Sequence, residues 1–338
     1  MPTVVLRPGV TVFVTGVNGL IGSHIVDQLL LRGYHVRGAV RNVEKNTWLV
    51  DWFTKKYNNV RLDLVDVPDM TEEGCYDDVV DGVDGFIHVA SPLGGFSDAS
   101  TAVAIGVKGG LNALQACAKT SSVKRFVFTS SSLAAAFPKP NVECSIDTQT
   151  YNEEAVEIVR KDPTIRGLSI YAALKTETEK AMWKWMEKNN PNFVMNTILP
   201  NVNFGRVLVP EHQGFPSTID WARAAWTGES LQAYANFVLP QWFISTEDSA
   251  LLHIGALIYG DVTSERLFGY AKRFNYNQIL AFFREFYPNK KFPKDLIGVG
   301  EDKMDVPNER AEEVLTWVKG SGWDGLAKSL KEMSGDWA

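Results

Sequence analysis

Short apolar runs alternate with stretches of helical periodicity through residue 203. The runs lie at residues 11–15, 34–40, 62–67, 85–92, 123–129 and 193–200, and most are rich in Val, Ile, Leu or Phe. Helical patterns occupy residues 23–32, 73–81, 102–118 and 171–188. Unbroken apolar runs of this length are typical of strands that are buried on both faces. The alternation therefore predicts an α/β fold with a doubly wound parallel sheet.

The pattern changes at Phe204. Between residues 204 and 242, aromatic segments are interrupted by proline and glycine, which suits a smaller lobe that closes an apolar pocket. Most of these aromatic side chains could equally form that lobe's own core. We expect residues 1–203 and about 243–262 to form the main domain, and residues 204–242 and 263–338 to form a smaller, mixed C-terminal lobe.

Composition and charge exclude several classes of protein. The chain has 34 Lys and Arg against 40 Asp and Glu, so its net charge of −6 gives no reason to expect a nucleic-acid partner. Cys75, Cys117 and Cys144 are odd in number and far apart, and the five histidines are scattered, so neither a disulfide framework nor a metal site is expected. The N-terminal apolar run is too short to span a membrane and lacks the small-residue cleavage site of a signal peptide, and we expect a cytoplasmic location.

A glycine-rich turn stands between the first strand and the first helix. Gly16, Gly19 and Gly22 follow the run at residues 11–15 directly. Strand, glycine turn and helix in this order indicate a dinucleotide-binding site, because the glycines allow a sharp turn and close approach of the pyrophosphate to the helix N-terminus. A glycine turn without a ligand is the alternative. The turn makes the predicted sheet Rossmann-type.

The end of the second strand bears on the choice of cofactor. An NAD-preferring site usually places Asp or Glu here, whereas this chain has Arg41, followed by Lys45. Positive side chains suit the 2′-phosphate of NADP, although Arg41 could also be a solvated charge. Asp66 and Val67 end the third strand, where an adenine ring would be bracketed.

Other strand ends are expected to face the same cleft. Residues 88–92 form a loop of small residues after a strand, with His88 expected to be buried and hydrogen-bonded. Hydroxyl side chains follow the central strand, from Thr129 to Ser132, and could bind a ligand or simply cap the next segment.

Tyr171 and Lys175 lie four residues apart in a predicted helix and therefore share one face. An ammonium close to a phenol favours the phenolate, so we expect Lys175 to lower the tyrosine pKa from about 10. The spacing is common, and a solvent-facing pair is the alternative. Its combination with the glycine turn and the strand-end serines favours a catalytic pair.

Taken in order, these motifs resemble the extended short-chain dehydrogenase/reductases. The chain is most similar to the dihydroflavonol-4-reductase-like branch and, within it, to yeast and fungal NADPH-dependent carbonyl (aldehyde) reductases, a match that residues 137–143 and 240–243 support. The resemblance covers nearly the whole chain. It implies an NADP-binding Rossmann domain, a substrate-binding lobe, a monomer or homodimer, and hydride transfer from NADPH to ketones or aldehydes, such as ketoesters and aryl ketones, to give alcohols.

The resemblance also assigns roles to residues. Tyr171 matches the tyrosine that protonates the carbonyl oxygen, Lys175 matches the lysine that binds the nicotinamide ribose, and Ser131 matches the serine that hydrogen-bonds the carbonyl. Ser130 is the alternative if the register is shifted by one. The expected substrate contacts are Phe96, Ser131, Leu174, Trp226 and Gln241. The expected cofactor contacts are Gly16, Asn18, Gly19, Leu20, Ile21, Gly22, Arg41, Lys45, Asp66, Val67, Val89, Ala90, Ser91, Thr129, Tyr171, Lys175, Pro200 and Val202.

Two other functions remain open. A nucleotide-sugar epimerase or dehydratase shares the fold and the Tyr-Lys pair, but the stretch from Trp221 to Phe243 contains only Arg223 as a base, which suits a sugar nucleotide poorly. A redox sensor that binds NADP without catalysis would tend to lose the Tyr-Lys pair, which this chain keeps. No Asn-Trp-Tyr-type motif surrounds Tyr171, which argues against a CoA thioester substrate.

Overall fold

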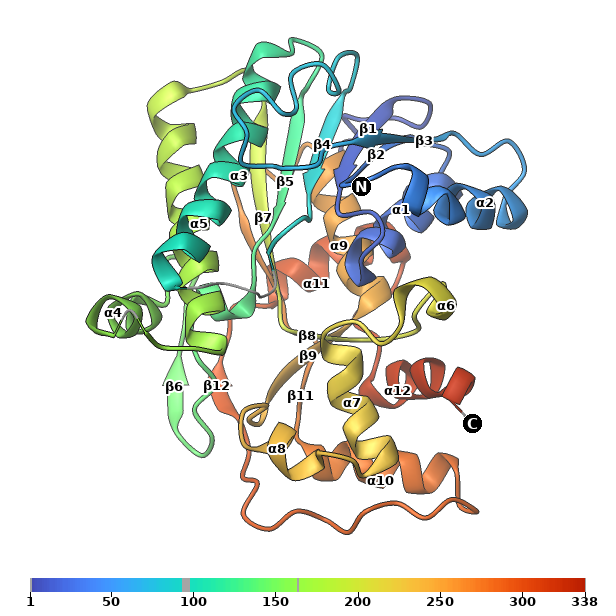
Figure 1. Ribbon diagram of the computed structural model, residues 1–338, viewed down its shortest axis with the longest axis vertical. Helices are drawn as coiled ribbons and strands as arrows, with labels where there is room; N and C mark the ends of the chain where they lie inside the picture. The colour runs from blue at the N-terminus through green and yellow to red at the C-terminus, as the bar shows by residue number, and fades with distance from the viewer. Residues whose placement is uncertain (1, 93–97, 163, 338) are drawn as a thin grey trace.

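The computed structural model describes residues 2–92, 98–162 and 164–337. A large sheet with helices on both faces occupies the upper half of Figure 1, and a smaller lobe lies below it. The predicted Rossmann-type doubly wound sheet with a smaller mixed lobe is confirmed. Among the described residues, no helix has both the length and the apolar character needed to cross a membrane.

The large sheet has seven parallel strands in the order β10-β7-β5-β4-β1-β2-β3. The chain builds outward from β1 to β3 and then restarts on the other side of β1 with β4. A ligand crevice forms at such a switch, outside the carboxyl ends of the two central strands. The bounds are β1 (Thr11–Thr15), β2 (His35–Val40), β3 (Leu62–Asp66), β4 (Gly85–His88), β5 (Arg125–Thr129), β7 (Val194–Pro200) and β10 (Arg266–Gly269).

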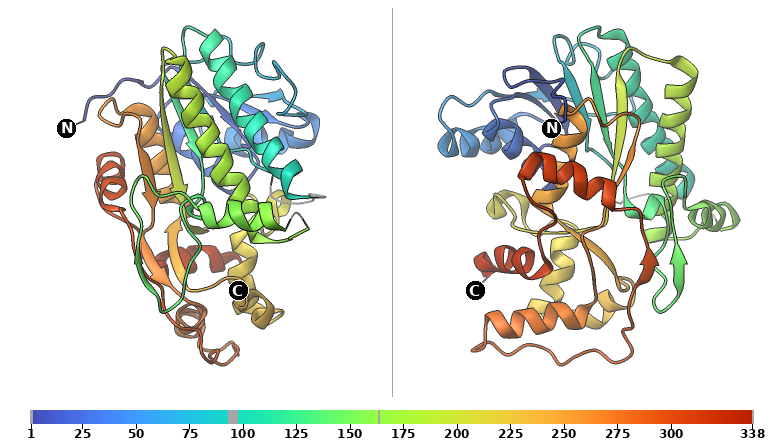
Figure 2. Two further views of the ribbon diagram at one scale, coloured as in Figure 1. Left: turned by 90° about the vertical axis from the view of Figure 1, so that its left-hand side faces the viewer. Right: turned by 180° about the vertical axis from the view of Figure 1, so that it is seen from behind.

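Helices cover both faces of this sheet. In Figure 2, α3 (Ala99–Lys119) and α5 (Leu168–Asn189) lie on the opposite side of the sheet from α11 (Glu309–Lys319). Helix α11 packs against α9 (Thr246–Ile258), which also packs against α1 (Leu20–Leu31). Glycines allow α3 and α5 to approach closely, since a Cβ on Gly106 would lie 2.5 Å from Thr178 Oγ1. This close packing holds α5, which carries Tyr171 and Lys175, directly against α3.

The smaller lobe contains a three-stranded sheet in the order β11-β9-β8, with β9 parallel to β8 and antiparallel to β11. Aromatic side chains fill its core, including Phe204, Phe243 and Phe283. Its elements are β8 (Val202–Phe204), β9 (Gln241–Ser245), β11 (Lys272–Phe274), α7 (Thr218–Thr227), α8 (Leu231–Ala235), α10 (Tyr276–Phe286) and α12 (Leu326–Ser334). The remaining elements are α2 (Thr47–Lys56), α4 (Glu153–Lys161), α6 (Pro210–Gln213) and a parallel pair, β6 (Glu143–Ser145) and β12 (Lys303–Asp305), besides short 3-10 helices at Glu44–Asn46, Ser132–Ala134 and Gly335–Trp337.

Two expectations need correction. Residues 73–81 form successive turns and no helix, and the left-handed backbone of Gly74 (φ 76°) breaks the helical pattern. The tail after residue 263 does not belong wholly to the smaller lobe, because β10 is the edge strand of the large sheet and α11 packs against α9. Strand β10 begins with Arg266 and ends with Gly269, so only Leu267 and Phe268 mark it as an apolar run.

Candidate active site

The glycine turn forms a cradle with no room for side chains. Gly16 has a positive φ of 68°, and a Cβ there would lie 3.1 Å from the backbone nitrogen of Ala90. A Cβ on Gly22 would lie 2.1 Å from the carbonyl oxygen of Gly16. Helix α1 begins at Leu20, so the N–H groups of its first turn have no partner within the helix. This edge is suited to a phosphate group.

Thr15 joins the ends of β1 and β4. Its Oγ1 accepts hydrogen bonds from the backbone nitrogens of Val89 (3.0 Å) and Ala90 (2.9 Å) and lies 3.1 Å from His88 Nδ1. The Thr15 hydroxyl can therefore donate a hydrogen bond to His88 Nδ1. Burial, together with the charge of Lys175, lowers the pKa of His88 to about 3, so this histidine is neutral. His88 is thus a buried, hydrogen-bonded residue that orders the loop, as expected.

Helix α6 reaches the glycine turn from the smaller lobe. The side-chain amide of Gln213 donates to the carbonyl oxygens of Asn18 and Gly19, each at 3.2 Å. Next to it, His212 stacks on Trp48 of α2 with ring centroids 4.7 Å apart. The segment around α6 therefore braces the proposed phosphate site. No sequence motif pointed to Gln213.

Arg41 and Lys45 are exposed and lie in the segment that follows β2. Asp66 at the end of β3 holds this segment, since its Oδ1 accepts a hydrogen bond from the backbone nitrogen of Val43 at 2.7 Å. The two cations are thus free to meet an anion at the edge of β2. Val67, also predicted to contact the cofactor, is buried with 6% of its surface exposed.

The Tyr171 phenol is partly buried on the first turns of α5. Burial raises its pKa to about 12, while a hydrogen-bonding interaction with Ser131 acts in the opposite direction. Ser131 is the N-cap of the short helix that follows β5, and its Oγ accepts a hydrogen bond from the backbone nitrogen of Leu133 at 3.2 Å. The structure therefore brings the two predicted hydroxyl donors together.

Ser130 is oriented differently. Its hydroxyl donates to Glu179 Oε2 at 2.6 Å, and only 2% of the residue is exposed. The Ser130 hydroxyl is thus committed to the protein interior, whereas the Ser131 hydroxyl interacts with Tyr171. This arrangement favours Ser131 over Ser130 in the predicted role.

Lys175 lies one turn after Tyr171 and is 2% exposed. Its Nζ donates to the carbonyl oxygen of Thr129 at 2.8 Å and lies 5.9 Å from the centroid of the Tyr171 ring. Burial lowers the pKa of Lys175 to about 7, although the charge of Glu179 acts to raise it. The expectation that Lys175 lowers the tyrosine pKa was wrong for this structure, because burial dominates at both groups and the tyrosine pKa rises.

His253 of α9 completes this inner layer. Its Nδ1 lies 2.6 Å from the carbonyl oxygen of Ser249, and its Nε2 lies 2.8 Å from Thr129 Oγ1. A carbonyl only accepts, so Nδ1 carries the proton and Nε2 accepts from Thr129. Burial lowers the pKa of His253 to about 4. Both oxygens of Thr129 are therefore used inside the protein, one of them to hold Lys175.

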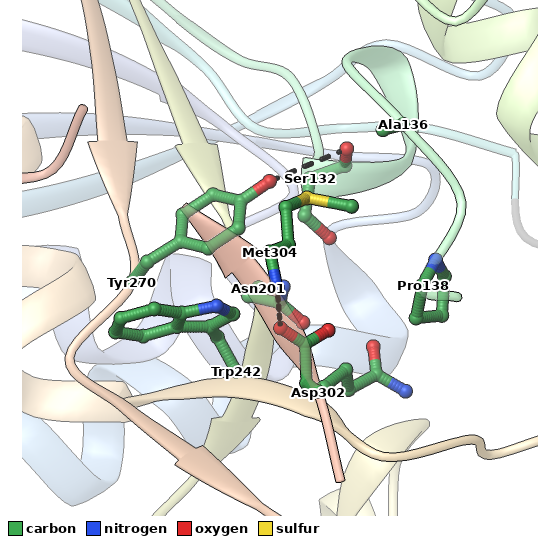
Figure 3. Close-up of a pocket in the computed structure, with 9 residues that line it drawn as sticks. Ser132, Ala136, Pro138, Asn201, Trp242, Tyr270, Asp302 and Met304 are labelled. Atoms are coloured by element: carbon green, nitrogen blue, oxygen red, sulfur yellow. Dashed lines mark hydrogen bonds between the residues drawn. The ribbon is translucent and has the colours of Figure 1, made fainter. Parts of the chain in front are cut away.

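A small cavity lies beside the short helix after Ser131 (Figure 3). Gln241, a predicted substrate contact, lies in its wall, and Tyr270 directs its hydroxyl toward the carbonyl oxygen of Ser132, 3.5 Å away. Burial raises the pKa of Asp302, whose Oδ1 accepts from the backbone nitrogen of Met304. The lining residues are Ser132, Ala136, Pro138, Asn201, Gln241, Trp242, Tyr270, Asp302 and Met304.

Two other predicted substrate contacts, Trp226 and Leu174, do not line this cavity. Trp226 is 7% exposed in the core of the smaller lobe, with its ring centroid 4.8 Å from that of Tyr287. Leu174 is 1% exposed and packs against α3 beside Gly106. Both are core residues, because their side chains face neighbouring helices. Phe96 lies outside the described residues.

The other predicted cofactor residues differ in burial and position. Leu20 is buried against the core of the smaller lobe, Ile21 and Ser91 are partly buried, Pro200 ends β7, and Val202 is buried in β8. The sequence reasoning missed Glu179, which lies at the same four-residue spacing after Lys175 as Lys175 after Tyr171. This repeated spacing could have indicated that Glu179 lies on the same helix face as Tyr171 and Lys175.

Comparison with known proteins shows the family. The family model described as "NAD dependent epimerase/dehydratase family" matches residues 12–227. The chain is 39% identical to Aldehyde reductase 2 of Sporidiobolus salmonicolor over 98% of this chain and 97% of that protein. It is 36% identical to Ketoreductase adrE of Penicillium rubens, over 97% and 96% of the two chains.

Among solved structures, Gre2 from Candida albicans in complex with NADPH has a TM-score of 0.82 and 23% identity, covering 96% of this chain and 98% of that one. That likeness shows the fold. The predicted resemblance is confirmed: the chain belongs to the NAD-dependent epimerase/dehydratase family of extended short-chain dehydrogenase/reductases and is an enzyme of that kind.

Proposed function

We propose that this protein is an NADPH-dependent carbonyl reductase that converts ketones and aldehydes to alcohols. The observation that carries the proposal is the meeting of the Ser131 hydroxyl and the Tyr171 phenol beside a buried Lys175 at the carboxyl end of β5. The relatives named aldehyde reductase and ketoreductase support it, since each matches nearly the full chain.

The residues present fit a dinucleotide. The first turn of α1 offers unpartnered N–H groups to a pyrophosphate, and a Cβ on Gly22 would close the cradle. Arg41 and Lys45 offer two exposed positive charges to a 2′-phosphate. When bound, NADPH supplies the hydride that reduces a carbonyl carbon.

The chain's own groups act on the carbonyl oxygen. Negative charge builds on this oxygen during reduction, so hydrogen bonds from Ser131 and Tyr171 strengthen in the transition state. Tyr171 then donates its phenolic proton to the oxygen. A pKa of about 12 keeps the phenol protonated through the physiological range, which suits reduction. Oxidation of an alcohol requires the phenolate and is disfavoured near neutral pH.

We propose that the smaller lobe, beginning at Phe204, supplies the substrate-binding surface. Gln241 and Trp242 of β9 lie at the cavity beside Ser132, where they can contact the group attached to the carbonyl. An aromatic lobe suits ketoesters and aryl ketones better than a charged sugar nucleotide. An epimerase or dehydratase function therefore has less support than a reductase function.

A substrate panel tests the proposal. Purified protein with NADPH should reduce at least one of a set of α-ketoesters, aryl ketones and aldehydes, as measured by loss of NADPH absorbance and by the alcohol formed. Tight NADPH binding without turnover of any carbonyl would contradict it and favour a sensor. Turnover of a nucleotide sugar alone would favour an epimerase or dehydratase.

A further inference from the structure

A buried carboxylate lies behind the Tyr171/Lys175 pair. Glu179 follows Lys175 by one turn of α5 and has no exposed surface. Its Oε1 accepts from Arg266 Nε at 2.7 Å and from Thr197 Oγ1 at 3.0 Å, and its Oε2 accepts from Ser130 Oγ at 2.6 Å. Donors from β10, from β7 and from the residue that follows β5 therefore converge on one carboxylate.

If Glu179 had only a structural role, its ion pair with Arg266 would be sufficient. Arg266 is itself anchored by the carbonyl oxygens of Thr148 and Thr150, each at 2.8 Å, and one guanidinium balances one carboxylate. Lys175 adds a second cation to the same buried region when it is protonated. Without Glu179, the buried guanidinium of Arg266 would have no carboxylate to balance its charge.

We propose that Glu179 is a positioning residue for the reduction: it stabilises the charged form of Lys175 and, by holding the Ser130 hydroxyl, turns the next residue, Ser131, toward Tyr171. This inference rests on the proposed function. It assigns Glu179 no contact with substrate or cofactor, since the carboxylate is enclosed by protein groups.

The groups around Lys175 support the electrostatic part. The positive charge of Lys175 acts to lower the pKa values of His88 in β4 and His253 in α9, and both histidines are neutral. Tyr171 is neutral as well, and Arg266 of β10 is a cation. Burial depresses the pKa of Lys175, and the opposing contribution comes from Glu179. Loss of this carboxylate should make Lys175 lose its proton at lower pH.

The test separates this role from folding. Glu179→Gln alone leaves Arg266 buried and unpaired, so the informative protein is Glu179→Gln/Arg266→Gln, which removes both charges. A matched control is Asp248→Asn/Lys319→Gln, because Asp248 is a fully buried carboxylate on another helix and pairs with Lys319 Nζ at 2.6 Å. All proteins are compared by thermal unfolding before kinetics.

In the folded double variant, we expect kcat to fall at a pH at least about one unit lower than in the wild-type protein. Near pH 8, its kcat should be about tenfold lower than that of the wild-type protein. The control should keep the wild-type profile. A readout free of catalysis is the 13C titration of labelled lysine side chains, with Lys175 assigned by its absence in Lys175→Met. Its midpoint should move to lower pH in the double variant.

An unshifted kcat profile and an unshifted Lys175 midpoint in the folded double variant would overturn the inference and leave Glu179 a structural residue. The proposed function fails differently: wild-type protein would then reduce no carbonyl at all. The Lys175 titration can be measured in either case, so the two failures are distinguishable.

Discussion

Lys175 donates a hydrogen bond to the backbone carbonyl of Thr129, with Nζ and O 2.8 Å apart. The bond joins helix α5, which carries the proposed acid Tyr171, to the end of β5, which carries Ser131 just beyond Thr129. The relative placement of the two hydroxyl donors therefore depends on a buried amine. This dependence leads to the first prediction.

The rate of reduction should fall as pH rises through the pKa of Lys175. That pKa lies at about 7, so the charged form predominates below pH 7 and is lost above it, while Tyr171, at about 12, stays protonated. We expect kcat/KM for carbonyl reduction to decrease about tenfold per pH unit on the alkaline side. A profile between pH 5 and 10 checks this, and a rate that stays level or rises would show that the lysine charge is not required.

Ser131→Ala should lower kcat by about 10²-fold, because it removes one donor to the developing oxyanion, with little change in NADPH affinity. Ser130→Ala is the matched control. It removes the bond to Glu179 and should lower the unfolding temperature, with a smaller effect on kcat. Steady-state kinetics and thermal unfolding of both variants decide the register. A larger kcat loss in the Ser130 variant would reverse the assignment.

Arg41→Asp should weaken NADPH binding by about tenfold or more, since it replaces a cation by an anion beside the proposed 2′-phosphate, and should shift preference toward NADH. Arg61→Asp makes the same charge change at another exposed position, just before β3, and should leave the ratio unchanged. Dissociation constants for both cofactors measure the effect. Equal ratios in wild type and Arg41→Asp would exclude the phosphate role.

Gly22→Ala should abolish tight NADPH binding or prevent stable folding of the turn, because the new Cβ would lie 2.1 Å from the carbonyl oxygen of Gly16. Gly325→Ala is the control, since nothing lies within 4 Å of a Cβ placed there. Calorimetric titration with NADPH and thermal unfolding separate the two effects. Normal affinity in a folded Gly22 variant would contradict the proposed cradle.

The sequence predicted most of the sheet, because parallel strands buried on both faces leave unbroken apolar runs. It also predicted the glycine turn and the Tyr171/Lys175 pair, whose spacing is local. It failed where tertiary packing decides the outcome. Trp226 and Leu174 proved to be core residues, and burial raises the pKa of Tyr171 although a lysine lies one turn away. Gln213 contacts the glycine turn from a segment that is distant in the sequence, and hydrophobic periodicity cannot predict such a contact.

The central claim is that Tyr171 donates the proton to the carbonyl oxygen, and Tyr171→Phe tests it most directly. The substitution removes one hydroxyl and keeps the ring in place. With a substrate that the wild-type protein reduces, kcat should fall by about 10²- to 10⁴-fold while the Kd for NADPH stays within about threefold of the wild-type value. A variant that retains wild-type kcat would show that another group protonates the product and would contradict the account.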